Sequence, residues 1–305
     1  MSVPASIGII GFGEVGSIFA RDLAAEGVAA IRAFDIAFGD AKSRAAQNRA
    51  AAGPAISGAE SAAQAVHGQP IVIAAVTAGS ALAAAQSAAP HLAKDALYLD
   101  VNSVSPGAKQ EIATAIEGAG GRFVEAAVMT SVPPKGLASP MLLGGRHAAA
   151  FMEAVAGLGM DLTPFSEKIG AASSVKMSRS IMIKGMEALC VECLLTARQY
   201  GVEKEVLASL TDTLVTDWRK TVRYMIGRAL KHGRRRAEEV REVARTVEEA
   251  GLDPFMARAT ALRQDWSADQ GNLVGDDAIA KAELEDLLDR VLASSGAAGR
   301  KAAAE

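Results

Sequence analysis

The first half of the chain alternates short runs of apolar or small residues with segments of helical periodicity. Such runs predict strands, and they cover residues 7–10, 29–34, 71–76, 96–99, 122–126, 141–145 and 161–165. The runs at residues 7–10 and 71–76 contain only apolar or small residues, which is typical of strands buried on both faces. The intervening residues 14–26, 40–52, 59–66, 81–89, 107–117 and 148–158 have the pattern of helices. Alternation of strand and helix predicts an α/β fold with a doubly wound, mostly parallel sheet of the Rossmann type.

The second half of the chain has no further strand pattern. Helical periods follow one another over residues 173–200, 203–228, 234–250, 254–266 and 278–292. We therefore predict a sheet domain over residues 1–168 and an all-helical domain over residues 169–293. Residues 294–305 are small or charged, and we expect a frayed tail there.

A glycine-rich turn directly follows the first predicted strand. Gly11, Gly13 and Gly16 have the G-x-G-x-x-G spacing that admits a tight turn, lets the backbone approach a pyrophosphate and brings a helix close to the strand. The residues expected at a dinucleotide are Gly11, Phe12, Gly13, Glu14, Val15 and Gly16. The alternative interpretation is a glycine turn needed for packing alone.

The second predicted strand ends on Asp35, nineteen residues after Gly16. A carboxylate at this position can accept hydrogen bonds from the ribose hydroxyls of the adenosine half, and its charge would repel a 2′-phosphate. NAD is therefore favoured as the cofactor. NADP is not excluded, because Lys42 and Arg44 are close enough in sequence to fold back.

The loops after the next two strands carry further candidates. Ligands of open α/β sheets lie beyond the carboxyl ends of the strands, so Val76 and Thr77 are expected at the cofactor. Asn102 and Ser103 are candidates for contact with cofactor or substrate. Ser105 precedes Pro106, which predicts a helix cap at this serine.

Composition narrows the class of protein. Half of the 305 residues are apolar and the net charge is −3, which gives no reason to expect nucleic acid or membrane partners. Only six residues precede the first strand and no apolar run is long enough to span a membrane, so we expect a cytoplasmic protein. Cys190 and Cys193 are spaced as in redox and metal motifs but lie within a helical pattern, and no metal site is predicted.

Lys176 lies near the start of the long predicted helix at the junction of the two domains. A lysine buried in such a cleft would have its ammonium form disfavoured, which suits a general acid or base. A surface lysine on a helix is the other interpretation, and the residues alone leave both open.

Four segments, in order, resemble the 3-hydroxyacid dehydrogenases, which include 6-phosphogluconate and 3-hydroxyisobutyrate dehydrogenases. They are the glycine turn, the loop of residues 100–106 (DVNSVSP), residues 125–131 (EAAVMTS) and the segment from Gly170 to Lys176. The resemblance implies Lys176 as the catalytic lysine, with Ser103, Thr130, Ser131 and Ser180 at the substrate.

The chain departs from the family pattern in two places. Met129, Thr130 and Ser131 replace the family's S-G-G turn, and Ser180 stands where an asparagine is expected. Both changes affect the binding of a substrate carboxylate more than the transfer of a hydride.

The helical half resembles a branch of this family whose carboxyl-terminal domain has no known function. Lys184 lies two helical turns beyond Lys176, and it could hold an anionic substrate group or form a salt bridge to a neighbouring helix. His232 and Arg235 belong to a basic cluster, interpreted either as a salt-bridged helix start or as a substrate anion site. The resemblance also implies a homodimer that pairs through the helical domain.

These observations together predict an NAD-dependent dehydrogenase acting on a small, anionic hydroxy acid or sugar acid, with Lys176 as general acid and base. Two alternatives remain, namely an imine or ketone reductase on the same fold and a non-catalytic NAD-binding regulator. The altered turn at residues 129–131 and Ser180 are the reason to keep the second alternative.

Overall fold

The computed structural model describes residues 4–214 and 217–295. The chain forms two compact units, one ending at Met177 and the other beginning at Ser178. The predicted domain boundary at residue 168 stays a prediction, and most of the predicted tail, from residue 296 onward, lies outside the described residues. No helix within the described residues is long and apolar enough to cross a membrane.

The first unit contains an eight-stranded sheet in the order β3-β2-β1-β4-β5-β6-β7-β8. The strands are β1 (Ser6–Ile10), β2 (Ala30–Phe34), β3 (Ile56–Gly58), β4 (Ile71–Ala74), β5 (Leu97–Asp100), β6 (Arg122–Val128), β7 (Met141–Gly144) and β8 (Leu162–Ser166). Every neighbouring pair is parallel except β6 and β7. The predicted doubly wound, mostly parallel sheet is confirmed.

Helices connect these strands on both faces of the sheet. They are α1 (Glu14–Ala25), α2 (Arg44–Ala50), α3 (Ala62–Val66), α4 (Ala81–Ala88), α5 (Pro106–Gly118) and α6 (Ala148–Ala154). The last strand, β8, is followed by α7 (Ala171–Tyr200), whose first residues belong to this unit. Short 3-10 turns are η1 (Ile36–Gly39), η2 (Ala78–Ser80), η3 (Ala89–His91) and η4 (Gly136–Ala138).

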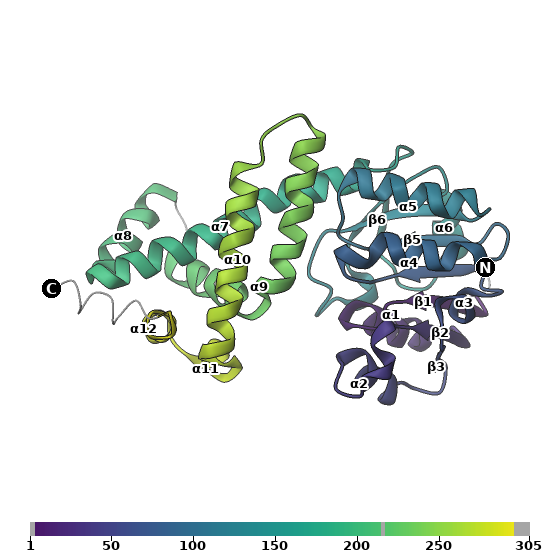
Figure 1. The fold of residues 1–305 in the computed structure, drawn as a ribbon, viewed down its shortest axis with the longest axis horizontal. Helices are drawn as coiled ribbons and strands as arrows, with labels where there is room; N and C mark the ends of the chain where they lie inside the picture. Colours follow the sequence, from purple (N-terminus) through teal and green to yellow (C-terminus); the bar gives the residue numbers. More distant parts are fainter. Residues whose placement is uncertain (1–3, 215–216, 296–305) are drawn as a thin grey trace. The chain divides into compact units, whose positions relative to one another are not determined.

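The central strands are rich in apolar residues because each of their two faces contributes to a different core. Ile9 packs with α1 and α6 residues such as Phe19 and Phe151. The next residue, Ile10, belongs to the opposite core, which α3, α4 and α5 cover with residues such as Ile112. Figure 1 shows α4 and α5 lying side by side over β4 to β6. Period-2 alternation therefore builds two cores from one sheet.

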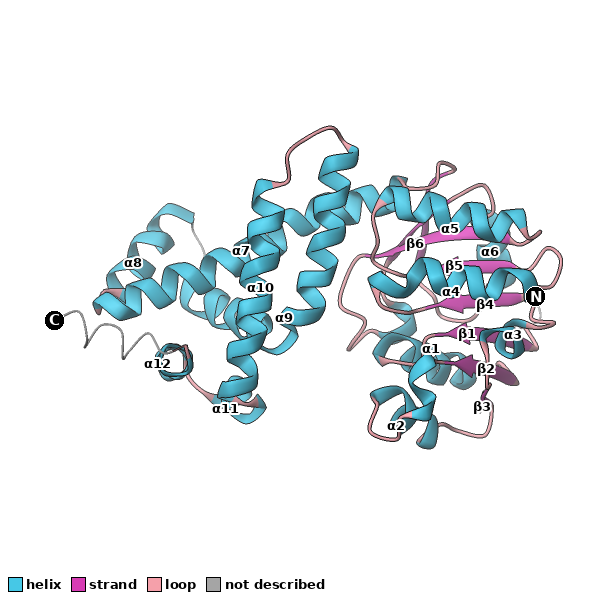
Figure 2. Cartoon of the chain, viewed as in Figure 1, coloured by secondary structure: helices cyan, strands magenta, loops and turns pink. Residues whose placement is uncertain are grey.

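The second unit is helical within the described residues. It consists of the rest of α7, α8 (Glu203–Leu214), α9 (Trp218–Glu249), α10 (Phe255–Val274), α11 (Asp276–Lys281) and α12 (Leu284–Ser294). The helices α9 and α10 run side by side (Figure 2). A Cβ at Gly233 would overlap the carbonyl oxygen of Gln264, and one at Gly271 would overlap that of Leu230. Glycine at these two positions therefore lets the two backbones meet.

The helix bounds correct several predictions. The break expected at residues 229–233 is absent, because α9 is continuous there and uses Gly233 for packing instead of a turn. The basic cluster around His232 is accordingly in the interior of a helix and does not begin one. The helix expected to end at residue 266 continues to Val274, and the one expected over residues 278–292 is divided into α11 and α12. The three-residue strand β3 was not predicted.

Candidate functional site

The carboxyl ends of β1, β4 and β5 form the place where a dinucleotide would bind in this fold. The strand order reverses between β1 and β4. From β1 the chain continues to β2 and β3 on one side of it, and the strands from β4 onward then lie on the other side. The turn after β1 touches the loop after β4, with the Ala75 amide donating to the Ile10 carbonyl at 2.8 Å. Ligands of doubly wound sheets bind at such a switch point.

The three glycines of the turn have separate roles. Gly11 has φ +91°, a conformation that side chains rarely adopt, and a Cβ there would overlap the Ala75 carbonyl. A Cβ at Gly16 would overlap the Gly11 carbonyl, so this glycine lets α1 pack on the turn. A Cβ at Gly13 would meet nothing within 4 Å. The backbone at Gly13 thus faces open space, as a pyrophosphate at the start of α1 requires.

Asp35 connects the end of β2 to the glycine turn. One carboxylate oxygen accepts a hydrogen bond from the Phe12 amide at 2.7 Å, and the other accepts from the Ala37 amide at 2.9 Å. The side chain remains partly exposed, so its oxygens stay accessible to further donors. This is the arrangement expected of a carboxylate that accepts from ribose hydroxyls.

The basic residues that left NADP open lie on or just before α2. The Arg44 guanidinium lies 3.3 Å from a carboxylate oxygen of Glu14, in the glycine turn. Lys42 is exposed to solvent. The Arg44 charge is therefore partly balanced by an acid in the turn.

Asn48 on α2 also holds the turn, and the sequence analysis missed it. Its amide nitrogen donates to the Phe12 carbonyl at 3.1 Å, to the Gly13 carbonyl at 3.0 Å and to Ser17 Oγ at 3.0 Å. Nothing in the local pattern distinguishes this residue, because its three acceptors lie more than thirty residues away.

Asn102 links the loop after β5 to the loop after β4. Its side-chain oxygen accepts from the Val76 amide at 2.7 Å, while Thr77 Oγ1 contacts Ser80 Oγ at 3.2 Å. Asn102 is only 4% exposed, and its amide nitrogen is buried without a partner among the described residues. A buried donor that lacks an acceptor is costly, so this nitrogen is suited to donating to a ligand.

The side chains of Ser103 and Lys176 meet in the first unit. Lys176 Nζ donates to Ser103 Oγ at 2.6 Å, and both residues are half-buried. Two residues along, Ser105 Oγ accepts from the Ala108 amide at 3.2 Å, which confirms the predicted cap of α5. A lysine amine next to a serine hydroxyl is a pair through which a proton can move.

Buried charged side chains bond to the segments on either side of this pair. Asp100 and Lys109 form a buried ion pair with Nζ 2.6 Å from Oδ1. Glu125 on β6 accepts from the amides of Gly170 and Ser173 at the start of α7, at 2.7 and 2.6 Å. Neither Lys109 nor Glu125 could be assigned a role from the sequence, although a glutamate within the mostly apolar run of residues 122–126 departs from the strand pattern.

The loop after β6 presents the residues that replace the family's S-G-G turn. Thr130 and Ser131 are exposed, and Met129 is half-buried. Farther along, the Leu137 amide donates to a carboxylate oxygen of Asp22 on α1 at 3.0 Å, which fixes the loop to the glycine-turn helix. The substrate contacts predicted for Thr130 and Ser131 stay predictions.

In the second unit, Lys184 is buried in a charged cluster. Its Nζ lies 2.9 Å from Glu239 and 3.2 Å from Ser180 Oγ, and Arg235 pairs with the same glutamate at 2.7 Å. Burial lowers the pKa of the Lys184 amine, and the charge of Glu239 opposes that shift. Of the two interpretations of Lys184, the structure contains the salt bridge to a neighbouring helix. The substrate roles predicted for Ser180, Lys184, His232 and Arg235 stay predictions.

Cys190 has the surroundings of a structural residue, whereas Cys193 lies at the surface. Cys190 packs in the helical core with its sulfur 3.5 Å from that of Met225, and burial raises the pKa of its thiol to about 12. Cys193 is exposed, and both thiols are free. Within the described part of the chain, no group of histidine, cysteine and acidic residues has the arrangement of a metal site.

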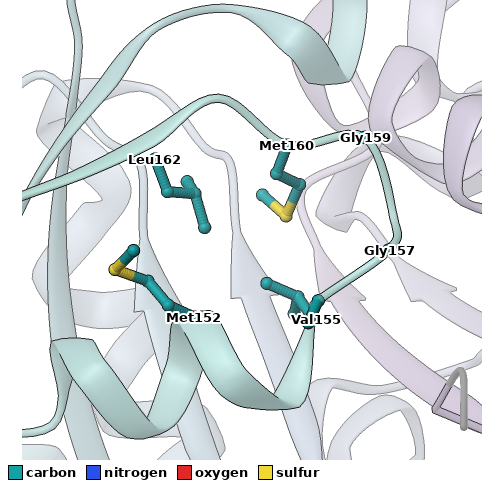
Figure 3. A pocket seen from close by; sticks show the side chains of 7 residues that line it. Met152, Val155, Gly157, Gly159, Met160 and Leu162 are labelled. Carbon is teal, nitrogen blue, oxygen red and sulfur yellow. The ribbon is translucent and has the colours of Figure 1, made fainter. Parts of the chain in front are cut away.

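A small pocket lies elsewhere, beside the edge strand β8. Figure 3 shows Met152, Val155, Met160 and Leu162 pointing into a cavity of about 130 Å³. The side chains that line it are apolar, so none of them could transfer a proton. This pocket is separate from the carboxyl ends of β1, β4 and β5.

Comparison with known families agrees with the geometry. Residues 6–156 match the NAD binding domain of 6-phosphogluconate dehydrogenase. Residues 197–267 match a domain of unknown function, DUF1932. The cofactor prediction is therefore confirmed at the level of an NAD(P)-binding domain.

Solved structures share both units. A conserved hypothetical protein from Sinorhizobium meliloti is 35% identical, with 96% of this chain and 97% of that chain covered and a TM-score of 0.71. A conserved protein of unknown function, described as structurally similar to 3-hydroxyacid dehydrogenases, is 32% identical, with 88% and 98% covered and a TM-score of 0.66. A 3-hydroxyisobutyrate dehydrogenase from Mycobacterium tuberculosis, solved with L-serine, is 17% identical, with 96% and 99% covered and a TM-score of 0.68, and it shows the fold alone. The chain therefore belongs to the 3-hydroxyacid dehydrogenase superfamily, in the branch whose helical half carries this domain of unknown function.

Proposed function

We propose that this protein is an NAD-dependent dehydrogenase that oxidises a hydroxyl group of a small, anionic hydroxy acid or sugar acid, or reduces the corresponding carbonyl. One observation carries the proposal. Lys176 Nζ and Ser103 Oγ lie 2.6 Å apart, on α7 and on the loop after β5, within the unit that has the NAD-binding fold.

In this proposal Lys176 is the general acid and base. When the substrate is oxidised, its amine takes the hydroxyl proton, and in reduction its ammonium returns that proton to the alkoxide oxygen. Ser103 Oγ holds the amine in place and orients the reacting hydroxyl. The hydride itself would be carried by the nicotinamide ring of the bound cofactor.

The residues around the glycine turn fit the cofactor assigned to them. Gly13 leaves open space for the pyrophosphate, and the partly exposed Asp35 can accept from the ribose. The unpartnered amide nitrogen of Asn102 is available to a ligand acceptor. NAD is preferred in the proposal because Asp35 is acidic and Arg44 is paired with Glu14.

Turnover assays test the proposal directly. A panel of 3-hydroxy acids and sugar acids is offered with NAD and with NADP, and reduction of the nicotinamide is followed by its absorbance. Lys176→Ala should lower turnover by about 10²- to 10⁴-fold while NADH still binds. The matched control is Lys168→Ala, which removes an exposed lysine eight residues earlier and should leave turnover unchanged. Unchanged turnover in Lys176→Ala would overturn the mechanism.

The reverse assay, in which cyclic imines are offered with NADH and with NADPH, separates the alternatives. Turnover of cyclic imines but not of hydroxy acids would point to an imine reductase. Binding of NADH without turnover of any substrate would point to a regulator, for which the exposed Thr130 and Ser131 are the structural motive.

We also propose that the protein is a homodimer paired through the helical unit. The support is the set of large apolar side chains that this unit exposes, among them Met182 (64%) and Leu189 (58%) on α7 and Leu262 (71%) on α10. Light scattering at micromolar concentration should give twice the mass of the chain. A monomeric mass would contradict the proposal.

A further inference from the structure

Two carboxylates occupy paired positions on adjacent strands, and each is hydrogen-bonded to one of the two segments that carry Ser103 and Lys176. Asp100, the last residue of β5, is the register partner of Glu125 on β6. Both side chains are 0% exposed. Ionised carboxylates in an interior are costly unless each oxygen is compensated, so a pair kept in this place needs a reason.

Asp100 is bonded to the turn that carries Ser103. Its Oδ1 accepts from Lys109 Nζ at 2.6 Å and from the Asn102 amide at 2.9 Å. Lys109 Nζ also donates to the Asp100 carbonyl at 2.9 Å. The ammonium group is therefore hydrogen-bonded to both the side chain and the backbone of the residue that ends the strand. These bonds fix the direction in which the chain leaves β5, and with it the position of Ser103, three residues later.

Glu125 is bonded to the start of the helix that carries Lys176. Its two oxygens accept from the Gly170 and Ser173 amides at 2.7 and 2.6 Å. Amides at a helix start have no partner within the helix and carry partial positive charge. Lys176 lies three residues after Ser173, on the same side of the helix and one turn along.

The fold makes room for the Glu125 carboxylate. A Cβ at Gly144 on β7 would lie 2.5 Å from Glu125 Oε2. Gly170, whose amide donates to the same oxygen, has φ +95°. Among the described residues no side-chain cation pairs with Glu125, so its charge is compensated by backbone amides alone. An apolar residue would fill this space at lower cost, but it could not fix the start of α7.

We infer that Glu125 and the Asp100–Lys109 pair are positioning residues, which hold the Lys176–Ser103 hydrogen bond from its two sides. Asp100 and Lys109 set the position of the hydroxyl, and Glu125 sets the position of the amine. That this hydrogen bond serves catalysis rests on the proposed function, whereas the hydrogen bond itself is a property of the structure.

The first test follows the reactivity of the Lys176 amine, which needs no substrate. The folded protein is treated with a limiting amount of an acylating reagent, and the labelling rate of each lysine is measured by peptide mass spectrometry. Exposed Lys94 and Lys135 serve as internal references. Ser103→Ala should raise the relative rate at Lys176 by about 2- to 10-fold, because the amine loses one hydrogen-bonding partner.

Glu125→Gln should raise the relative labelling rate of Lys176 toward the rate measured in Ser103→Ala. The amide group of glutamine offers one acceptor instead of two, so one of the two α7 amides loses its partner, and the helix start is no longer neutralised near the lysine. The double variant Asp100→Asn with Lys109→Met, which leaves no lone buried charge, should have the same effect. If Glu125→Gln does not fold, Glu125→Asp keeps the charge and shortens the reach, and it should give the same direction of change.

A matched control separates positioning from general loosening. Glu203 in the helical unit is also a buried glutamate at a helix start, where it pairs with Arg198 at 2.5 Å. Glu203→Gln should lower stability without changing the relative rate at Lys176. A wild-type rate at Lys176 in folded Glu125→Gln would overturn the inference.

The second test applies once a substrate has been found. Glu125→Gln should lower kcat by about 10- to 100-fold, as expected of a displaced catalytic group, while the KM for NAD changes less than about twofold. A parallel loss in kcat and NAD binding would overturn the inference in favour of a purely structural role. Altered labelling in a protein that turns over no substrate would uphold the positioning and reject the dehydrogenase proposal.

Discussion

The two units both bury charged side chains, but they bond them to different partners. In the sheet unit, Glu125 accepts hydrogen bonds from backbone amides alone at the start of a helix, and Asp100 accepts from the Asn102 amide as well as from its ion-pair partner Lys109 where the chain leaves a strand. In the helical unit, Glu187 (1% exposed) on α7 pairs with Arg236 (3% exposed) on α9, with Nε at 2.6 Å from Oε2. Gln264 on α10 donates to the same glutamate at 3.2 Å.

This difference indicates two uses of a buried charge. A carboxylate bonded to amides fixes the path of one loop or helix start and hence the side chains that follow it. An ion pair between helices fixes how the helices lie against one another. Substitutions in the first set should change the site with moderate effects on stability, whereas those in the second set should change stability and leave cofactor binding intact.

The largest loss of stability is expected from Glu187→Gln. The substitution leaves Arg236 buried and charged without its counter-ion, which costs about 3–5 kcal/mol in comparable cases. The free energy of unfolding is measured by urea denaturation, and NADH affinity should be unchanged in the folded variant because the glycine turn belongs to the other unit.

The matching double variant sharpens this prediction. Glu187→Leu combined with Arg236→Met removes both charges, and it should recover most of the stability lost in Glu187→Gln. A double variant as unstable as the single one would mean that packing volume, and not the unpaired charge, accounts for the loss.

Gly233→Ala should have the next largest effect. The added methyl group would overlap the Gln264 carbonyl and force α9 and α10 apart, for a cost of about 1–3 kcal/mol. Gly185→Ala on α7 is the control, because its Cβ would meet only Thr260 Oγ1 at 3.9 Å, an ordinary van der Waals distance. That control should be neutral or gain up to about 1 kcal/mol from helix propensity. Equal losses in the two variants would refute close packing as the reason for Gly233.

Most of the fold could be predicted because its patterns are local. All-apolar runs such as residues 71–76 form strands whose two faces are covered by helices, and the glycine turn could be predicted from its own spacing and the strand before it. The continuity of α9 could not be predicted in this way. Gly233 resembles a helix terminator until α10 is seen to lie against it.

The candidate site, too, could be predicted only in part. Lys176 and Ser103 could be singled out from family-like segments, but their contact joins residues 73 apart. The bonds from Glu125 to Gly170 and Ser173 span 45 and 48 residues. Nothing in either segment alone indicates such a partner, so the residues that support the site became visible only in the structure.

Ser105→Ala, in the sheet unit, should have a smaller effect on stability. Loss of the cap on α5 should cost about 1 kcal/mol of stability. Ser61→Ala is the control, because Ser61 caps α3 in the same way by accepting from the Gln64 amide. Both variants should lose similar stability by urea denaturation, but only Ser105→Ala should lower turnover, because Ser105 ends the loop that carries Ser103. Equal turnover in the two variants would show that the cap does not control the loop.

The smallest effect is a pH dependence at Lys184. Because burial lowers the pKa of this amine, the folded chain holds its proton less tightly than the unfolded chain does. The free energy of unfolding therefore gains a contribution as pH rises toward the ordinary lysine pKa of 10.5, and the gain is complete above it. Lys184→Met lacks this contribution, so wild type should become more stable relative to the variant over that range. Lys281→Met, which removes an exposed lysine paired with Asp277, should follow wild type at every pH. Parallel curves for wild type and Lys184→Met would mean that Glu239 fully offsets the cost of burying the ammonium.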